Sequence, residues 1–204
     1  MVLVHGGGWG GGDKVFTLGW AWDLAKDGYT SIAVNYRRSG EAPFPAAISD
    51  VKCAVRWLYA HAEELNVDTS RMTAMGHSAG GHLVALLGTA NKSARLEGDG
   101  PHQDQPSNVK AVVAIAAVAT FDDWLQDPQK NIHGAIERFL GVAALADRPD
   151  LVQQASPLTY VSKDDPPFLL IHGTDDKLIP VDQARRMGAA LEEVGVPAQV
   201  HIYE

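Results

Sequence analysis

The sequence contains a single cysteine, Cys53, so no disulfide can link two of its own residues. Because Cys53 falls within an expected helix, a buried structural thiol is the simplest interpretation of it. Long apolar runs are also missing: the most apolar stretch, residues 109–119, has only the length of a strand. These absences exclude a disulfide-stapled scaffold and a helical membrane span. Repeats and low-complexity segments are absent too.

Basic residues are in the minority, with 17 Lys and Arg against 25 Asp and Glu, which gives a formal net charge of -8. Nucleic acids and anionic membrane surfaces attract basic faces, so neither is expected as a partner. The acidic residues are spread along the chain and therefore say little about a substrate. A hydrophobic content of 46% and a charged content of 21% are ordinary for a globular protein, and 204 residues suffice for one α/β domain.

Residues 73–82 carry the pattern Gly-x-Ser-x-Gly with Ser78 at its centre, between a hydrophobic strand and an alanine- and leucine-rich helix. A serine hydroxyl is a weak nucleophile, and a sharp strand-to-helix turn presents it where a base can reach it. Gly76 and Gly80 fit such a turn, because side chains there would collide, and the turn strains the serine backbone. Ala79 then begins the helix with its N–H free to face a developing oxyanion. The alternative is an ordinary turn in which Ser78 caps the helix.

A second glycine-rich segment follows the first predicted strand and is called the glycine loop, His5–Gly12. Its glycines let backbone N–H groups approach a ligand closely, which suits a phosphate or an oxyanion. A phosphate loop needs a Gly-Lys-Ser/Thr ending, which is absent here. The sequence therefore favours an oxyanion loop, with Gly7 and Gly8 as N–H donors beside Ala79.

Two side chains of the glycine loop have roles of their own. We expect His5 to hold the loop by hydrogen bonds rather than to act as a base. Trp9 either lines an acyl pocket or packs in the core, and the sequence does not decide between the two.

Apolar segments of strand length alternate along the chain with segments of helical spacing. Strands are expected near residues 1–4, 31–35, 72–75, 109–118, 167–172 and 199–204, and helices near residues 15–26, 46–65, 80–90 and 181–194. This alternation predicts an α/β fold with a mostly parallel sheet covered on both faces, a three-layer α/β/α sandwich. The polar residues 91–108 predict an exposed loop or part of a lid, and helical pieces within residues 120–161 predict a cap over the site.

Residues 120–124 follow a predicted strand at its carboxyl end, where open α/β sheets bind ligands. Phe121 and Trp124 are therefore candidate substrate-binding residues, with core packing as the equal alternative. Asp122 and Asp123 could be paired acid–base carboxylates. Adjacent side chains rarely converge on one bond, so a capping or solvated role is favoured for them.

Three motifs, taken together, resemble those of the α/β-hydrolases: His5-Gly6-Gly7-Gly8-Trp9, the Ser78 segment, and His172-Gly173-Thr174-Asp175-Asp176-x-x-Ile179-Pro180. The resemblance is strongest to carboxylesterases and lipases related to hormone-sensitive lipase, including the feruloyl- and acetyl-esterase-like group. It covers essentially the whole chain, and it is specific to the fold and to esterase chemistry rather than to one substrate.

The resemblance implies a role for each matched residue. Ser78 would be the nucleophile, and the oxyanion hole would be formed by Gly7, Gly8 and Ala79. Asp176 would be the acid of the triad, because the family's acid precedes two variable residues and then Val/Ile-Pro, and Asp175 is the fallback. Such an enzyme acts on a small-molecule ester through an acyl-serine and needs no metal or organic cofactor.

Two features depart from the family pattern. Family members have further strands before the glycine loop, whereas this sequence opens directly on a predicted core strand. The family histidine lies in a loop after the last strand, but the only histidine after Asp176 is His201, whose neighbours predict a strand. We therefore expect residues 1–204 to form one partial domain, incomplete at both termini, with the catalytic histidine beyond Glu204.

Other function classes fit part of the sequence. A non-catalytic binding protein would keep the pocket and lack a triad member, and longer sequence at both ends would decide this. Arylformamidases and peptidases occur on the same scaffold, although the glycine loop favours esters. A metal hydrolase using His77, His82 or His172 is disfavoured, because His77 and His82 are poorly placed to share an ion. Localisation and oligomeric state are left open.

Overall fold

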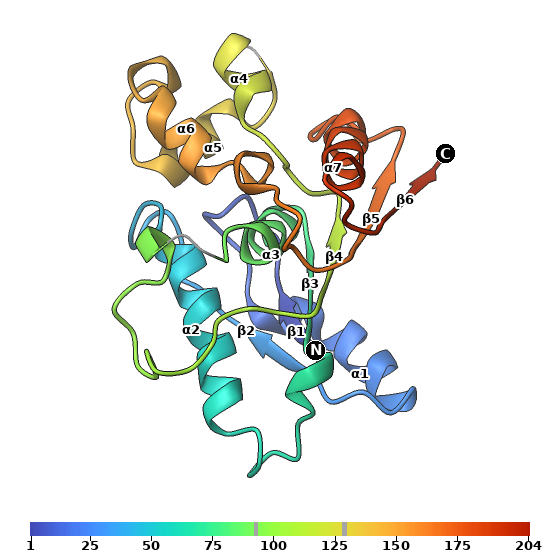
Figure 1. Cartoon of the computed structure of the whole chain (residues 1–204). Helices are drawn as coiled ribbons and strands as arrows, with labels where there is room; N and C mark the ends of the chain where they lie inside the picture. The colour runs from blue at the N-terminus through green and yellow to red at the C-terminus, as the bar shows by residue number, and fades with distance from the viewer. Residues whose placement is uncertain (92–93, 128–129) are drawn as a thin grey trace.

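The computed structural model describes residues 1–91, 94–127 and 130–204 and contains one parallel sheet in that part of the chain (Figure 1). Its strands are β1 (Val2–Val4), β2 (Ile32–Val34), β3 (Thr73–His77), β4 (Ala111–Ile115), β5 (Phe168–Gly173) and β6 (Ala198–Tyr203). They lie in the order β2-β1-β3-β4-β5-β6, and every neighbouring pair is parallel. The predicted α/β fold with a mostly parallel sheet is thus confirmed.

Helices connect the strands, as the alternating pattern predicts. They are α1 (Leu18–Lys26), α2 (Ala46–Ala60), α3 (Ala79–Thr89), α4 (Asp122–Gln126), α5 (His133–Leu140), α6 (Pro149–Ala155) and α7 (Asp182–Glu193). Short 3-10 helices lie at Lys14–Thr17, Thr69–Arg71, Ala94–Leu96, Leu145–Asp147 and Pro157–Tyr160. The predicted helix 46–65 is shorter in the structure, because turns replace it after Ala60 and Asn66 adopts a left-handed φ of 52°.

The two faces of the sheet are covered to different extents. Gly88 of α3 approaches Phe168 and Gly188 of α7 approaches Leu170, and these two side chains point to the same side of β5. The helices α3 and α7 therefore cover one common face. On the opposite face Leu3 of β1 is fully buried, whereas apolar residues of β3, β4 and β5 are only half-buried: Met75, Val113, Ile115, Leu169 and Ile171. In Figure 1 the strands β1 and β2 lie between α2 and α1.

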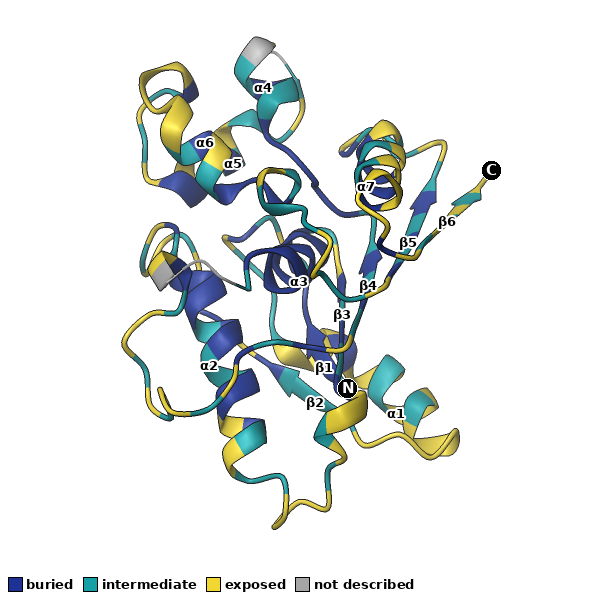
Figure 2. Cartoon of the chain, in the orientation of Figure 1, coloured by how far each residue is buried: buried dark blue, intermediate teal, exposed yellow. Residues whose placement is uncertain are grey.

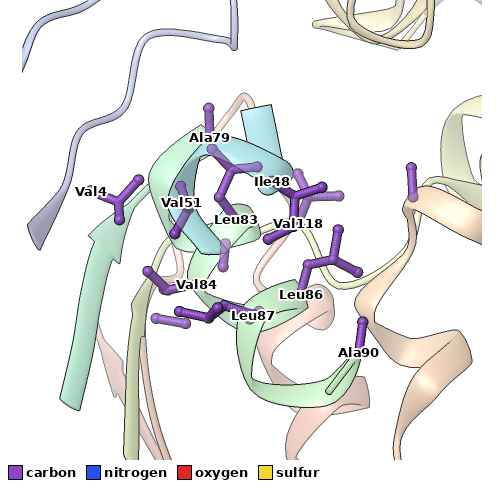
Figure 3. Packing of buried hydrophobic residues seen from close by; sticks show 14 of the residues in the cluster. Val4, Ile48, Val51, Ala79, Leu83, Val84, Leu86, Leu87, Ala90 and Val118 are labelled. Carbon is purple, nitrogen blue, oxygen red and sulfur yellow. The ribbon is translucent and has the colours of Figure 1, made fainter. Parts of the chain in front are cut away.

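The centre of the core is α3, whose residues are all buried (Figure 2). A helix that is apolar on every side must be enclosed by other elements. Figure 3 shows its leucines packed among residues of neighbouring elements, such as Val4 of β1 and Ile48 and Val51 of α2. The turn at Ser78 therefore begins the most enclosed helix of the domain.

Residues 91–108 connect the end of α3 to the start of β4, and the described part of this segment packs along α2. The Glu97 carboxylate binds Lys52 Nζ at 2.7 Å and Arg56 Nη1 at 2.9 Å, and both of these cations are fully buried. Burial lowers the pKa of Lys52, and the bond to Glu97 opposes that effect. The described part of the segment is therefore anchored beside α2.

Parallel strands end at one edge of the sheet, which gathers the loops that follow β1, β3, β4 and β5. Figure 1 shows α4, α5 and α6 grouped beyond this edge. These helices belong to the segment predicted as a cap, residues 120–161, of which residues 128–129 lie outside the described part. One of the bonds that join this segment to the rest of the domain is donated by the Leu158 N–H to the Ala119 carbonyl oxygen at 2.9 Å.

Candidate active site

Ser78 occupies a sharp turn between β3 and α3. Its φ of 56° and ψ of −121° are rarely adopted by a residue with a side chain, so the surrounding structure must hold it there. One such restraint is its N–H, which donates to the Ile115 carbonyl oxygen at 2.8 Å. The side chain makes no capping bond to α3, which argues against the helix-cap alternative. The hydroxyl is half-buried and is not engaged by the helix it precedes.

The glycines on either side of Ser78 allow close backbone approach. A Cβ on Gly76 would meet the carbonyl group of Gly80, and one on Gly80 would meet the Val4 carbonyl oxygen. Both contacts would be far shorter than real Cβ contacts. The expectation that side chains would collide in this turn is confirmed.

The glycine loop lies directly against the Ser78 turn. A Cβ on Gly6 would lie 3.3 Å from the Ser78 Cβ, and Gly7 has a φ of 124° that favours glycine. The Gly7 carbonyl oxygen accepts hydrogen bonds from the N–H groups of Gly10 and Gly11, which closes the loop into a tight turn. Sequence reasoning missed the contact made by Gly6, although its position before two further glycines was a usable signal.

Three backbone N–H groups near the turn are available to a ligand. Within the described residues, the Gly7 and Gly8 N–H groups have no protein acceptor. The Ala79 N–H belongs to the first turn of α3, where no intrahelical acceptor exists. These are the donors that the sequence predicts for an oxyanion hole.

His5 holds the glycine loop, as predicted. Its Nδ1 donates to the Gly6 carbonyl oxygen at 2.7 Å, and its ring stacks on Tyr36 with the ring centres 4.4 Å apart. The Tyr36 hydroxyl donates in turn to the His5 carbonyl oxygen at 3.1 Å. Burial raises the pKa of Tyr36, so the phenol stays protonated as this donor. Nothing in the sequence links Tyr36 to the loop, and its part in the site emerges only from the fold.

The three aromatic candidates for substrate binding pack inside the protein. Trp9 is 2% exposed, and Phe121 and Trp124 have no exposed surface. The Trp9 ring stacks on Phe139 with the ring centres 4.8 Å apart, and it meets Phe121 edge-on with the ring centres 5.6 Å apart. The packing alternative thus describes all three side chains in this structure, and substrate contact by them stays a prediction.

Asp176 and Asp175 are neighbours with different environments. Asp176 Oδ1 accepts hydrogen bonds from the N–H groups of Leu178 at 2.9 Å and Ile179 at 3.0 Å, and Oδ2 lies 3.4 Å from His172 Nε2. The Asp175 side chain is 93% exposed, against 22% for Asp176. Asp176 is therefore the fixed carboxylate of the pair.

Asp176 also faces the strand that carries the turn. Burial lowers the pKa of His77, the residue before Ser78, while the Asp176 carboxylate acts in the opposite direction. Because β4 alone separates β3 from β5, neighbouring loops at this edge bring Asp176 to the same side of the molecule as Ser78.

Three histidines that the sequence singles out lie away from the Ser78 hydroxyl: His201, His172 and His82. His201 lies within β6, paired in register with Ile171, and its side chain is on the exposed face, so the prediction of a strand residue is confirmed. His172 Nε2 donates to the Ile179 carbonyl oxygen at 2.9 Å. His82 is bound to Trp9 and Ala155. Across residues 1–91, 94–127 and 130–204, no histidine makes a hydrogen bond to the Ser78 hydroxyl.

Asp122 and Asp123 lie in the first turn of α4, and the Asp123 side chain binds residues of α7. Asp123 accepts hydrogen bonds from Gln183 Nε2 and Arg186 Nη1, both at 2.9 Å. These bonds fasten α4 to α7 and leave Asp123 in a structural role. In the described residues no group of three or more His, Cys, Asp and Glu side chains could hold a metal ion. No helix in the same part of the chain is long and apolar enough to cross a membrane.

Comparisons with known proteins agree with this geometry. The family model described as BD-FAE matches residues 1–191. Esterase LipC of Mycobacterium tuberculosis (strain ATCC 25618 / H37Rv) is 31% identical over 196 residues, which cover 95% of this chain and 48% of LipC. The chain spans about half the length of the curated relatives it matches over nearly its whole length.

Solved structures are similar over nearly the whole chain. A bifunctional GH43-CE protein of Bacteroides eggerthii has a TM-score of 0.90 and 31% identity, covering 99% of this chain and 30% of that one. The acetyl ester-xyloside bifunctional hydrolase of Caldicellulosiruptor lactoaceticus has a TM-score of 0.84 and 28% identity. The match covers 99% of this chain and 71% of the hydrolase. The chain therefore belongs to the BD-FAE family and has the α/β-hydrolase fold of these esterases.

Proposed function

We propose that the protein hydrolyses carboxylic esters through an acyl-serine intermediate on Ser78. The observation that carries this proposal is the strained turn at Ser78. This turn holds the half-buried serine against the glycine loop, and the serine side chain makes no capping hydrogen bond to α3. Strain of this kind costs on the order of 1–3 kcal/mol, so its presence favours a functional reason. The names of the relatives support ester hydrolysis as the reaction class.

The reaction has two halves that use the same groups. Ser78 Oγ attacks the ester carbonyl carbon while a base takes its proton, and the carbonyl oxygen becomes an oxyanion. The N–H groups of Gly7, Gly8 and Ala79 donate to that oxyanion. The intermediate then expels the alcohol, which receives the proton from the base, and water releases the acid from Ser78 by the same steps.

Asp176 is proposed to orient the general base and to stabilise its cation. Two backbone bonds fix Oδ1. Oδ2 lies 3.4 Å from His172 Nε2, but the His172 N–H is donated to the Ile179 carbonyl oxygen, so Oδ2 is the oxygen left to accept from the catalytic histidine. We propose that this histidine is not among residues 1–204. His201 projects from a strand face, and His82 and His172 are bound to backbone carbonyl oxygens.

The substrate is proposed to carry a short acyl group, acetyl being the reference case. Trp9, Phe121 and Trp124 are buried, so none of these three side chains lines an open channel for a long acyl chain in this structure. The acetyl ester named for the Caldicellulosiruptor relative supports the same class.

The test is hydrolysis of p-nitrophenyl acetate, butyrate and octanoate by the complete gene product, with Ser78→Ala as the control. The proposal predicts turnover that falls steadily with chain length and vanishes in the Ser78→Ala protein. Equal turnover in both proteins would exclude Ser78 as the nucleophile. Faster turnover of the octanoate would exclude the short-acyl proposal alone.

A further inference from the structure

We propose that His82 is a positioning residue that fixes the glycine loop relative to Ser78 and acts as a neutral imidazole. The inference rests on the proposed function, because its effect is expressed through the N–H groups of Gly7 and Gly8. His82 itself touches no reacting atom.

His82 lies one turn into α3, directly behind the nucleophile. Its N–H donates to the Ser78 carbonyl oxygen at 2.9 Å, which is the first bond of the helix after the strained turn. Its side chain is completely buried. The ring is therefore fixed in position relative to Ser78 by the helix itself.

Both nitrogens of the His82 ring bind other parts of the site. Nδ1 accepts from the Trp9 indole N–H at 3.1 Å, and Nε2 lies 2.7 Å from the Ala155 carbonyl oxygen. Trp9 belongs to the glycine loop, and Ala155 ends α6 in the segment proposed as a cap. One side chain thus connects the nucleophile helix, the glycine loop and the helices beyond the sheet edge.

The partners determine which nitrogen carries the proton. An indole N–H can only donate, so Nδ1 must be unprotonated, and a carbonyl oxygen can only accept, so Nε2 must carry the hydrogen. The neutral Nε2–H form satisfies both bonds, whereas the imidazolium would set an N–H against the Trp9 N–H. Complete burial acts in the same direction, since it lowers the pKa of His82 to about 4.

The Trp9 anchor bears directly on the proposed oxyanion donors. Trp9 follows Gly8 in the chain and has a φ of 57°, a left-handed conformation that is unfavourable for a residue with a side chain. Its carbonyl oxygen accepts from the Ser39 N–H at 2.9 Å, and its ring stacks on Phe139. Its indole N–H donates to His82, so releasing that bond frees one of the restraints that hold the loop in this shape.

Two substitutions separate the two bonds of His82. Asparagine places a carbonyl oxygen near the position of Nδ1 and can still accept from Trp9, while glutamine places an amide N–H near Nε2 and can still donate to Ala155. Each variant loses one buried hydrogen bond. A purely structural role of His82 therefore predicts a similar loss of kcat in both variants. Positioning of the glycine loop predicts a loss of kcat in His82→Gln alone.

The experiment measures kcat and KM for p-nitrophenyl acetate with the complete gene product, His82→Asn, His82→Gln, Trp9→Phe and the double variant His82→Gln/Trp9→Phe. We expect His82→Gln and Trp9→Phe each to lower kcat on the order of 10- to 100-fold with little change in KM, because misplaced donors weaken transition-state binding. His82→Asn should keep kcat within about fivefold of the wild type. The double variant should lose no more than either single one, because both remove the same bond.

Equal losses in His82→Asn and His82→Gln, a loss confined to KM, or additive losses in the double variant would each overturn the inference. Those results, with an active wild-type protein, would leave the proposed function intact. Absence of ester turnover in the wild-type protein would instead overturn the proposed function.

Discussion

Gly6 and Ser78 are in contact although they lie on different loops: a Cβ on Gly6 would be 3.3 Å from the Ser78 Cβ and 2.9 Å from the His77 carbonyl oxygen. A methyl group at Gly6 must therefore push the glycine loop away from Ser78. We predict that Gly6→Ala lowers kcat for p-nitrophenyl acetate on the order of 10²-fold, as small misplacements of catalytic groups do.

The matched control for that variant is Gly19→Ala in α1, where an added Cβ meets no atom within 4 Å. Alanine is the better helix former, so this control should keep kcat and gain about 0.5–1 kcal/mol of stability. Full activity in Gly6→Ala would show that the glycine loop is not part of the reaction site.

The proposal that Asp176 is the acid of a catalytic triad can be tested with variants of two adjacent residues. Asp176→Asn should lower kcat on the order of 10⁴-fold, because an amide cannot orient and stabilise the histidine as a carboxylate does. Asp175→Asn should change kcat by less than about threefold, since its side chain points into solvent. Steady-state kinetics on the complete gene product measure both values. If the large loss occurred at Asp175, the two assignments would have to be exchanged.

Burial of His82 predicts a specific pH dependence of stability. The pKa of this histidine is lowered from 6.5 to about 4 in the folded protein. Between these values the unfolded chain binds a proton that the folded chain does not, so the free energy of unfolding falls as the pH falls from about 6.5 towards 4. Above about pH 6.5 the neutral form dominates in both states and this group has no effect.

The expected loss from His82 alone is about 3 kcal/mol between pH 7 and pH 4. Urea unfolding of the complete gene product and of His82→Gln, each at pH 7 and pH 4, isolates the contribution of His82 to this loss of stability. All other titrating groups are common to the two proteins, so their effects cancel in the comparison. The stability difference between them should shrink by about that amount at pH 4. A difference that is the same at both pH values would mean that His82 is not held neutral.

Part of the site could be predicted because the Ser78 turn has a strict local rule: it requires glycine at positions 76 and 80. The choice of Asp176 over Asp175 came instead from the family resemblance, and the structure gives Asp176 the more buried and more fixed side chain of the two. Strand identity followed from apolar runs, and His201 was placed correctly from its neighbours.

The rest depends on contacts between distant segments. The bond between Trp9 and His82 joins residues 73 positions apart. The alternation of apolar and polar residues along the chain does not indicate which side chains from distant segments meet in the core. The role of Trp9 is therefore left open by the sequence, and His82 is considered there only as a disfavoured metal ligand. Two further contacts could not be predicted for the same reason: the hydrogen bond from the Tyr36 hydroxyl to the His5 carbonyl oxygen, and the ion pairs of Glu97 with Lys52 and Arg56. Sequence patterns indicate which face is buried, and the fold decides the partners.

Residues 1–204 expressed alone are predicted to self-associate and to lack ester turnover. Within the described residues the outer edge of β2 has no partner strand, and unpaired edges template association. The half-buried apolar face at Met75 and Ile115 adds surface of the kind that aggregates. Size-exclusion chromatography and p-nitrophenyl acetate turnover test this. A monomer whose turnover is abolished by His201→Ala would contradict it and make His201 the base.

The most direct test of the central claim is covalent labelling of the complete gene product with a fluorophosphonate probe, followed by mass spectrometry of the peptide that contains Ser78. Phosphonylation needs an activated serine hydroxyl, which the proposed mechanism provides only at Ser78. One labelled site is expected, at Ser78, and no labelling of the Ser78→Ala protein. Labelling that persists after this substitution, or that falls on another serine, would contradict it.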